Sequence, residues 1–333
     1  MRILITGISG FAGSWLAEYL VSTQPEAEIF GTVRLHSSLE NLTGILNRIK
    51  LRTIDIRDAH SVSSLIQEIR PDRVFHLAAI TFVPASWKAP IETFETNVIG
   101  TINLLEAVRQ LNKDDLRILV AGSSEEYGLV NADETIEHPE IPIKESNPLR
   151  PLSPYGVSKL AQEKLAWQYF KSYGIKCIIT RAFNHEGPRR PKDFVLSSFC
   201  WQAAKQELDP EKNEIEISCG WLQAFRDFSD VRDVVRAYAK IIEQGKPGEV
   251  YNICSGKPTR ISVLIEMLSL ITKKPVTIRQ DPSRMRPSDV PLLWGDCSKL
   301  KATIDWKPEY SLKETMRDCF EYWLNKIKQG GAI

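Results

Sequence analysis

Along the first 181 residues, short continuous apolar runs alternate with longer stretches in which apolar residues recur at every third or fourth position. The apolar runs have the length and composition of buried strands, and they fall at 2–6, 28–33, 51–58, 73–79, 117–121 and 176–181. The stretches at 62–69, 90–110 and 154–172 indicate helices. Such alternation is typical of parallel strands connected by helices. The sequence therefore predicts an α/β fold with a doubly wound parallel sheet of the Rossmann type.

The regular alternation ends near residue 181. A polar, turn-rich stretch follows at 182–191, and beyond it short strands and helices occur without a repeating order. We therefore expect a Rossmann domain at 1–181, to which later segments can return. The remainder, 182–330, is expected to form a smaller mixed α/β lobe that binds the substrate.

The composition argues against several classes of protein. The 43 Lys and Arg against 42 Asp and Glu leave a formal net charge of +1, so no overall basic field favours a nucleic-acid partner. The six cysteines are scattered without a Cys-x-x-Cys pair, which argues against a metal site and for reduced thiols. The first strand begins at Arg2, which leaves no room for a signal peptide, and no apolar run could span a membrane. We expect a cytoplasmic protein.

A glycine-rich loop lies between the first strand and the first predicted helix. Gly7, Gly10 and Gly13 allow a tight turn, a close approach of the backbone to a pyrophosphate, and close packing of the helix on the strand. The loop therefore indicates a dinucleotide site with the phosphates at the helix N-terminus. The loop residues expected to bind the cofactor are Gly7, Ser9, Gly10, Phe11, Ala12 and Gly13.

The end of the second strand indicates which dinucleotide binds. NAD sites usually carry an acidic residue there, which binds the ribose hydroxyls. This strand ends at Arg34 instead, which could pair with the 2′-phosphate of NADP or could be a solvated arginine. Asp55 is placed to meet the adenine side, and Thr81 to face the nicotinamide or the substrate. The other residues assigned to the NADP site are Ile56, Leu77, Ala78, Ala79, Asn97, Tyr155, Lys159 and Arg181.

A tyrosine and a lysine share one face of the predicted helix at 154–172. Ser153 is a suitable N-cap and Pro154 suits the first helical position. Tyr155 and Lys159 are four residues apart and are therefore neighbours on the helix surface. A free tyrosine titrates at about pH 10, and a nearby lysine cation favours the phenolate. The pair could act as a general acid or base, although the same spacing also arises by chance.

Polar residues also follow the predicted strand at 117–121. Ser123, Ser124 and Glu125 come just after it, at the end of the sheet where open α/β folds bind ligands. A hydroxyl, a carboxylate, a phenol and an ammonium group would thus converge from two neighbouring segments. The sequence predicts a proton-transfer site there.

The C-terminal part carries several arginines near predicted loops. Arg189, Arg190, Arg226 and Arg286 all come from this part of the chain. Guanidinium groups bind phosphates through paired hydrogen bonds. Any one of them could be a surface salt bridge, but together they indicate a lobe that holds an anionic substrate.

These motifs resemble one family over nearly the whole chain, about 1–325: the extended short-chain dehydrogenase/reductases that act on sugar nucleotides. Thr6-Gly7-x-x-Gly10-x-x-Gly13, the Ser123 region, Tyr155-x-x-x-Lys159 and Arg181-Ala182-Phe183-Asn184 occur in the family's order. Within it, the chain is most similar to the GDP-mannose 4,6-dehydratases and to the related GDP-4-keto-6-deoxy-mannose reductases. The stretch 183–190 is similar to the dehydratases' nucleotide-binding segment, and 286–290 resembles their Arg-Pro-Thr-Glu-Val segment.

The resemblance implies roles for individual residues. Ser123 becomes the active-site hydroxyl, Tyr155 the acid or base at the C4 hydroxyl, and Lys159 its pKa partner and a ligand of the nicotinamide ribose. Glu125 falls at the position of the dehydratases' base. The implied contacts to a GDP-sugar are Thr81, Ser124, Glu125, Asn184, Arg189, Arg190, Val195, Arg226, Arg286 and Asp289.

The resemblance favours a dehydratase, because Glu125 could remove the C5 proton once C4 is oxidised. Water would then leave from C6, and the hydride would return there. A reductase needs only Tyr155 as acid and fresh NADPH, and reductases also carry an acid near Glu125. Dehydratases usually have threonine where Ser123 stands, and Trp87 is more like the reductases.

Two further alternatives stay open. A C4 epimerase would not need Glu125, and a non-catalytic NADP sensor would not need the Tyr155 and Lys159 pair. The sequence does not distinguish a hexose from a heptose substrate. Because family members pair through helices like those at 90–110 and 154–172, we expect a homodimer or homotetramer.

Overall fold

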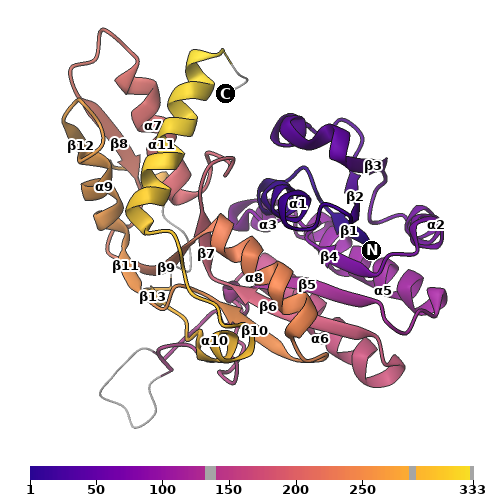
Figure 1. Ribbon diagram of the computed structural model, residues 1–333. Coiled ribbons are helices and arrows are strands. Elements are labelled where there is room, and N and C mark those ends of the chain that lie inside the picture. Colours follow the sequence, from indigo (N-terminus) through magenta and orange to yellow (C-terminus); the bar gives the residue numbers. More distant parts are fainter. Residues whose placement is uncertain (132–139, 285–289, 331–333) are drawn as a thin grey trace.

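The computed structural model describes residues 1–131, 140–284 and 290–330, and its centre is a seven-stranded sheet. The strand order is β10-β6-β5-β4-β1-β2-β3, and neighbouring strands are all parallel. The strands are β1 (Arg2–Thr6), β2 (Glu28–Val33), β3 (Ile49–Thr53), β4 (Arg73–His76), β5 (Arg117–Ser123), β6 (Lys176–Ala182) and β10 (Val250–Ile253). The predicted doubly wound parallel sheet is confirmed (Figure 1).

Helices cover both faces of the sheet because successive strand residues point to opposite sides. Ile5 of β1 belongs to the apolar cluster on one face, and its neighbour Leu4 belongs to the cluster on the other. The first face is covered by α1 (Phe11–Thr23), α8 (Val231–Gln244) and α10 (Ser298–Ile304). The second is covered by α2 (Ala59–Ile69), α5 (Gly100–Leu111) and α6 (Pro154–Tyr173). The short connections include η1 (Glu40–Arg48), α3 (Val83–Lys88) and η3 (Ser124–Glu126).

The helix predicted over 90–110 forms in three consecutive pieces. α4 (Pro90–Phe94) leads into a π-helical turn, η2 (Glu95–Ile99), which continues as α5. Asn97 lies in this turn and is fully buried. Its side chain accepts a hydrogen bond from the Ile80 N–H at 2.8 Å and donates one to the Ser158 hydroxyl at 2.9 Å. The turn thus fixes the loop after β4 to α6.

The chain returns to the sheet after the predicted boundary at residue 181. β10 pairs with β6, with Val250 opposite Ile179, and α8 packs on the same face as α1. Three segments beyond residue 230, namely α8, β10 and α10, therefore complete the Rossmann part.

The remaining segments form the C-terminal lobe, which lies beside the carboxyl ends of the central strands (Figure 1). Its strands are β7 (Asn184–Glu186), β8 (Ile215–Cys219), β9 (Phe225–Asp230), β11 (Pro258–Arg260), β12 (Val276–Gln280) and β13 (Leu292–Leu293). Its helices are α7 (Val195–Glu207), α9 (Ile261–Ser269), η4 (Pro282–Arg284) and α11 (Leu312–Lys328). An apolar cluster of its own joins β8 to α7, α9 and α11. The lobe therefore has a separate core.

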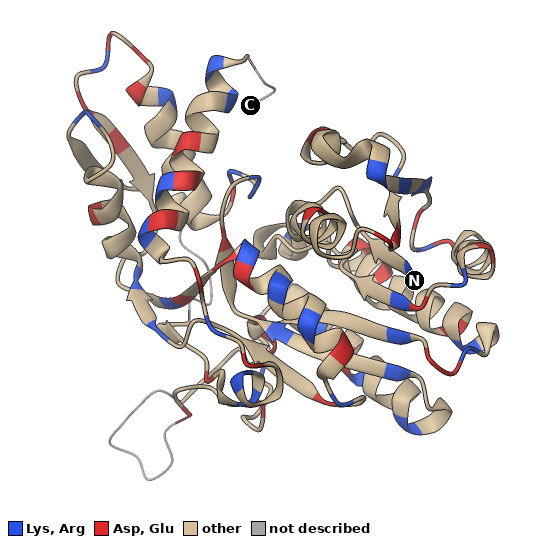
Figure 2. Cartoon of the chain, in the orientation of Figure 1, with Lys and Arg blue, Asp and Glu red and all other residues tan. Residues whose placement is uncertain are grey.

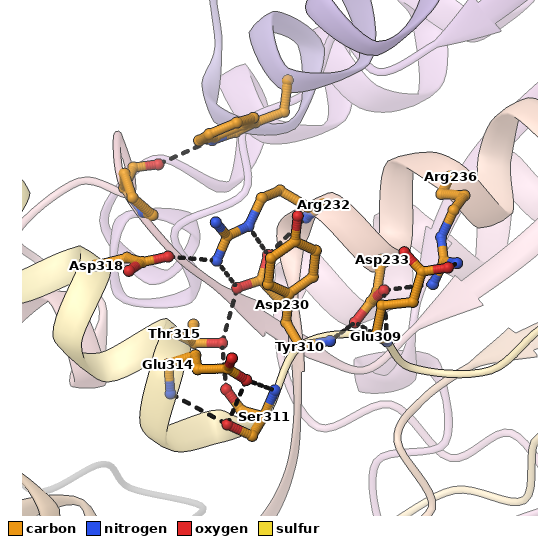
Figure 3. A network of polar contacts seen from close by, with 12 residues as sticks. Asp230, Arg232, Asp233, Arg236, Glu309, Tyr310, Ser311, Glu314, Thr315 and Asp318 are labelled. Carbon is orange, nitrogen blue, oxygen red and sulfur yellow. Dashed lines mark hydrogen bonds and ion pairs between the residues drawn. The ribbon is translucent and has the colours of Figure 1, made fainter. Parts of the chain in front are cut away.

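Charged side chains join the lobe to the Rossmann part where α8 begins. Asp230 caps α8 by accepting from the Arg232 N–H, and the Thr315 hydroxyl of α11 donates to the same carboxylate at 2.7 Å. The Arg232 guanidinium lies between Asp230 and Asp318, at 2.8 and 2.7 Å (Figure 3). These contacts hold α11 to α8.

Positive and negative residues are interspersed along most of the ribbon (Figure 2). Within residues 1–131, 140–284 and 290–330, no helix has both the length and the apolar character needed to cross a membrane.

Candidate active site

A cavity of about 910 Å³ lies between the central strands and the C-terminal lobe. One wall comes from the loops after β1, β4 and β5 and from the start of α6. The opposite wall comes from 182–199, 219–226 and 283–284. Open parallel sheets bind ligands in this position, beyond the carboxyl ends of the strands.

The loop after β1 is shaped to receive phosphates. Gly7 has a φ of 71°, and a Cβ on it would lie 3.0 Å from the Ala78 Cα. A Cβ on Gly13 would lie 2.4 Å from the Gly7 carbonyl oxygen, so neither position accepts a side chain. α1 begins at Phe11 without a side-chain cap, which leaves its first N–H groups for a ligand. A dinucleotide diphosphate fits this cradle, and all six predicted loop residues line the cavity.

Two arginines face the cavity beyond the ends of β2 and β3. Arg34 lines the cavity as predicted, and its N–H donates to the Ser37 hydroxyl at 3.1 Å. Asp55 also lines it, but its carboxylate is bound by Arg57 through hydrogen bonds of 3.0 and 2.6 Å. The hydrogen bonds from Arg57 lower the pKa of Asp55 and keep it ionised. Two cations beside a serine fit a ribose phosphate at this end.

Buried hydrogen bonds behind the cavity fix the loop after β4. The Thr6 hydroxyl accepts from the N–H groups of Leu77 and Ala78, each at 3.1 Å, and bonds to His76 Nδ1 at 2.9 Å. Burial lowers the pKa of His76 to about 3, so this histidine is a neutral core residue. The predicted residues Ile56, Leu77, Ala78, Ala79 and Thr81 all line the cavity.

The predicted proton-transfer residues meet at the carboxyl end of β5. β5 ends at Ser123, and α6 starts beside it with Ser153 accepting a cap hydrogen bond from the Gly156 N–H at 3.0 Å. Tyr155, in the first turn, is 7% exposed, lines the cavity and is hydrogen-bonded to the Ser123 side chain. The chain therefore places a phenol and a hydroxyl together at the inner end of the cavity.

Burial determines the protonation of this pair. Burial raises the pKa of Tyr155 well above its usual value, although the hydrogen bond to Ser123 opposes the shift. Burial also lowers the pKa of Lys159 to about 8. The expected lowering of the tyrosine pKa by Lys159 is therefore not seen, because burial dominates and the charges of Glu125 and Glu126 raise the pKa further. The site holds Tyr155 as a neutral phenol, which is an acid.

Glu125 approaches the same point from η3. Its backbone N–H donates to the Ser123 hydroxyl at 3.2 Å, and its side chain lines the cavity with Ser124 and Thr81. A carboxylate is thus available beside the Ser123–Tyr155 pair, as the sequence predicted.

The lobe contributes cations that rest on aromatic rings. Arg190 lines the cavity with its guanidinium 3.6 Å from the centre of the Phe194 ring and 4.9 Å from that of Phe11. Arg226 also lines the cavity, and it donates to the carbonyl oxygens of Phe225 and Val290 at 2.8 Å. The predicted residues Asn184 and Val195 lie on the same wall.

Two residues that were predicted to bind ligands do not line the cavity, and their assignments are corrected. Arg181 was assigned to the cofactor, but its guanidinium binds Glu163 at 2.7 and 2.9 Å and does not line the cavity. Arg189 was assigned to the substrate, but it binds Glu18 of α1 at 2.6 Å and stacks on Trp15. In both cases a nearby carboxylate satisfies the arginine.

Two other predicted residues lie behind the cavity wall, and their assignment to the cofactor stays a prediction. Asn97 holds Ile80 and Ser158, as described above, and does not line the cavity. Lys159 donates to the Ala121 carbonyl oxygen at 2.8 Å and is 3% exposed. Both position residues that do face the cavity. The predicted contacts Arg286 and Asp289 lie outside the described residues.

Several cavity residues were missed from the sequence. They are Ser37, Arg57, Lys88, Lys192, Trp221 and Arg284. Arg57 had a local signal, since it follows Asp55 by two residues, but the others come from loops or very short helices whose direction no periodicity indicates. In the described part of the chain, no group of three His, Cys, Asp or Glu side chains could hold a metal ion.

Comparison with known proteins agrees with this geometry. The chain matches the family described as GDP-mannose 4,6 dehydratase over residues 4–319. A GDP-6-deoxy-D-mannose reductase of Pseudomonas aeruginosa is 32% identical over 328 residues, which is 98% of this chain and 99% of the relative. A GDP-mannose 4,6-dehydratase of Yersinia enterocolitica is 30% identical over 370 aligned positions, covering 100% of this chain and 96% of the relative.

The fold is shared with solved structures. The structure of RMD from Pseudomonas aeruginosa in complex with NADPH superimposes with a TM-score of 0.81 at 31% identity, over 98% of this chain and 99% of that one.

Proposed function

The chain belongs to the GDP-mannose 4,6 dehydratase family of extended short-chain dehydrogenase/reductases, and on this premise we propose that it reduces the 4-keto group of GDP-4-keto-6-deoxy-mannose with NADPH. The observation that carries the proposal is the match to the P. aeruginosa reductase, which runs through 98% of this chain and 99% of that one. The dehydratase alignment extends over 370 positions for a chain of 333 residues, so it needs gaps. The reductase is therefore placed before the dehydratase, whereas Glu125 alone favoured the dehydratase.

The Rossmann wall is proposed to hold NADPH. Gly7, Gly10 and the start of α1 would bind the diphosphate, and Arg34 with Ser37 the 2′-phosphate. When bound, NADPH supplies a hydride to C4 of the sugar. Thr6 and Asn97 hold the loop after β4, against which the nicotinamide end would lie.

Tyr155 is proposed to donate its phenolic proton to O4 as the carbonyl is reduced. Its raised pKa keeps it protonated and so ready to act as acid. Ser123 hydrogen-bonds the phenol and could also contact O4, which would align the donor with the carbonyl. Lys159, fixed on Ala121, places a positive charge near the ring, 6.0 Å from its centre, where a phenolate would form.

The lobe wall is proposed to bind the GDP part of the substrate. Arg190 and Arg226 are cations on this wall, and guanidinium groups suit a diphosphate. The sequence assigned Arg286 and Asp289 to the same ligand, and that assignment stays a prediction.

GDP-mannose 4,6-dehydration is the second candidate function, and Glu125 favours it. Glu125 lines the cavity beside Tyr155, where a carboxylate could remove the C5 proton after C4 is oxidised. The C6 hydroxyl would then leave as water, and the hydride held on the cofactor would return to C6. This reaction has no net redox change and consumes no NADPH.

One experiment separates the two candidates. The purified protein is given GDP-mannose alone in one sample, and GDP-4-keto-6-deoxy-mannose with NADPH in another. We expect NADPH oxidation and a deoxysugar product in the second sample only. Formation of the 4-keto sugar in the first sample would establish the dehydratase, and Glu125→Gln should then stop deuterium exchange at C5. No turnover in either sample would contradict both candidates.

We also propose that the protein forms a homodimer, or a tetramer of such dimers. Large apolar side chains are exposed on α4, η2 and α6, which contact one another, among them Ile91, Ile99, Val157 and Trp167. Burying them against a second copy would remove apolar surface from water. Light scattering should give a dimer or tetramer mass, and Ile91→Asp with Trp167→Asp should give a monomer.

The six cysteines are buried free thiols, which supports a reducing compartment such as the cytoplasm.

A further inference from the structure

A buried cluster of charged side chains lies behind the active site and has no part in the chemistry proposed above. Glu126 ends η3, Glu163 lies on α6 and Arg181 lies on β6, and each is at most 3% exposed. Arg181 donates to both oxygens of Glu163, at 2.7 and 2.9 Å. By contrast, Glu126 Oε2 is 3.6 Å from Arg181 Nε and has no hydrogen-bond partner in the structure.

The buried part of the cluster contains two carboxyl groups and one guanidinium group. Lys164 also contacts Glu163, at 2.9 Å, but its side chain is largely exposed and its charge is screened by water. One proton shared by the two carboxyl groups therefore keeps the buried part neutral. Glu163 takes the paired hydrogen bonds of Arg181, which lower its pKa although burial opposes them. Burial and the neighbouring Glu163 raise the pKa of Glu126. The proton therefore belongs on Glu126, where its donor can face the Glu163 carboxylate.

Glu126 also touches the backbone of the active site. Its Oε1 atom accepts a hydrogen bond from the Ser123 N–H at 2.7 Å, in a reciprocal cap with the Ser123 side chain. The contact is close, since a Cβ on Gly122 would lie 2.5 Å from the same oxygen. Ser123 in turn hydrogen-bonds Tyr155. A continuous chain of contacts thus runs from Arg181 to the catalytic phenol.

We propose that Glu126 is a positioning residue: it fixes the backbone of Ser123 and, by pairing with Glu163 under Arg181, keeps the negative charge of the cluster away from Tyr155 and Lys159. The inference rests on the proposed proton transfer by Tyr155. A neutral carboxyl group at this position accepts from Ser123 and donates to Glu163, which is the pattern that a glutamine amide would also provide.

The pH dependence of Tyr155 depends on the titratable groups around it and around the buried cluster. Glu125 and Glu126 from η3 and Arg190 from a loop act on Tyr155 directly. The others packed nearby are His76 from β4, Tyr127 and Glu145 from loops, Lys159, Glu163 and Lys164 from α6, and Arg181 from β6. Only the location of the Glu126–Glu163 charge is changed by the variants below.

Two charge-matched variants test the proposal. In Glu126→Gln the negative charge stays on Glu163, so kcat and the pH profile should remain close to those of the wild type. In Glu163→Gln the charge must move to Glu126 to balance Arg181, which brings it nearer to Tyr155. A nearer negative charge raises the tyrosine pKa, so the limb of the kcat profile set by Tyr155 should move up by about one pH unit. A purely structural role would lower stability in both variants and leave both profiles in place.

A third variant tests the contact with Ser123. Glu126→Leu keeps the volume but removes the acceptor of the Ser123 N–H, so kcat should fall by about tenfold with little change in KM. An unchanged kcat in this variant, or a Glu163→Gln profile that coincides with the wild type, would overturn the proposal. Circular dichroism and NADPH titration establish that each variant is folded.

A direct titration keeps this test separate from the proposed function. The ultraviolet tyrosinate spectrum is followed against pH in proteins with and without the Tyr155→Phe change, and the difference reports Tyr155 alone. Its midpoint should be higher in Glu163→Gln than in Glu126→Gln. If the wild type turns over neither substrate, the proposed function fails while this midpoint still decides the role of Glu126. Equal midpoints would contradict the role even in an active enzyme.

Discussion

The two walls of the cavity differ in how their polar side chains are held. On the Rossmann side, polar residues directly behind the wall support it through short, buried hydrogen bonds. Thr6 bonds to His76 at 2.9 Å, Asn97 accepts from the Ile80 N–H at 2.8 Å, and Lys159 donates to the Ala121 carbonyl oxygen at 2.8 Å. Such contacts leave each group a single position.

On the lobe side, the cations lie mainly on aromatic rings. The Arg190 guanidinium stacks on Phe194, and Lys192 lies 4.9 Å from the centre of the Trp201 ring. A ring supports a cation without fixing its direction as firmly as a hydrogen bond does. Under the proposed function, the Rossmann wall would set the geometry of hydride and proton transfer, and the lobe wall would adapt to a flexible diphosphate.

The largest effect on kcat is expected from replacing Tyr155, the residue of the Rossmann wall that is proposed to donate the proton. Tyr155→Phe keeps the ring packing but removes the proton, so kcat should fall by about 10³-fold. NADPH affinity should change little, because the phosphate contacts are distant from the phenol. Steady-state kinetics and a fluorescence titration of NADPH measure the two quantities. A variant with more than about a tenth of wild-type kcat would remove Tyr155 from the proposed mechanism.

A smaller effect, on KM rather than on kcat, is expected on the lobe wall. Arg190→Ala removes a cation that would contact the substrate diphosphate, so KM for the GDP-sugar should rise by about 10- to 100-fold. Arg189→Ala is the matched control, because that neighbouring arginine binds Glu18 outside the cavity. If the two variants raise KM equally, Arg190 has no special contact with the substrate.

Replacing Arg34 tests how the Rossmann wall recognises the 2′-phosphate. Arg34→Ala should reduce the preference for NADPH over NADH by about tenfold, because one charge-assisted contact to the 2′-phosphate is lost. Arg57 remains as a second cation there, so some preference should persist. Arg52→Ala, whose guanidinium pairs with Glu68 on the surface, is the control. Equal preferences in wild type and Arg34→Ala would contradict the assignment.

Part of the Rossmann wall could be predicted from the sequence. Its glycine loop, Tyr155 and Ser123 follow directly from strand and helix ends, where local pattern fixes the direction of a side chain. All three lie on the cavity as predicted.

The residues that the sequence misplaced are those whose partners are distant in the chain. Arg181 was assigned to the cofactor because nothing local shows that Glu163, 18 residues earlier, would satisfy it. Arg189 and Arg190 are adjacent and equivalent in the sequence, yet one faces Glu18 and the other the cavity. A turn residue with a φ of 75° at Arg189 separates their directions, and backbone geometry of this kind is set by tertiary packing.

Glu186 has the smallest expected effect on turnover, and it tests how the lobe wall is supported. It is 1% exposed, lies 3.9 Å from Arg190, and has one oxygen without a hydrogen-bond partner. Burial raises its pKa from 4.5 to about 7, although the charge of Arg190 opposes the shift. The folded state therefore keeps the proton at pH values where the unfolded chain has lost it.

The sign of the pH effect follows from that difference in protons. Below about pH 4.5 both states carry the proton, and as the pH rises towards 7 the unfolded state loses it first, so stability falls. This group alone should lower the free energy of unfolding by about 2 kcal/mol between about pH 5 and about pH 7. Glu186→Gln cannot ionise, so denaturant unfolding at the two pH values should show a correspondingly smaller loss, whereas the exposed control Glu28→Gln should keep the wild-type loss. Identical losses in wild type and Glu186→Gln would mean that Glu186 is ionised throughout, held as a permanent ion pair with Arg190, and the lobe wall would then be as firmly fixed as the Rossmann wall.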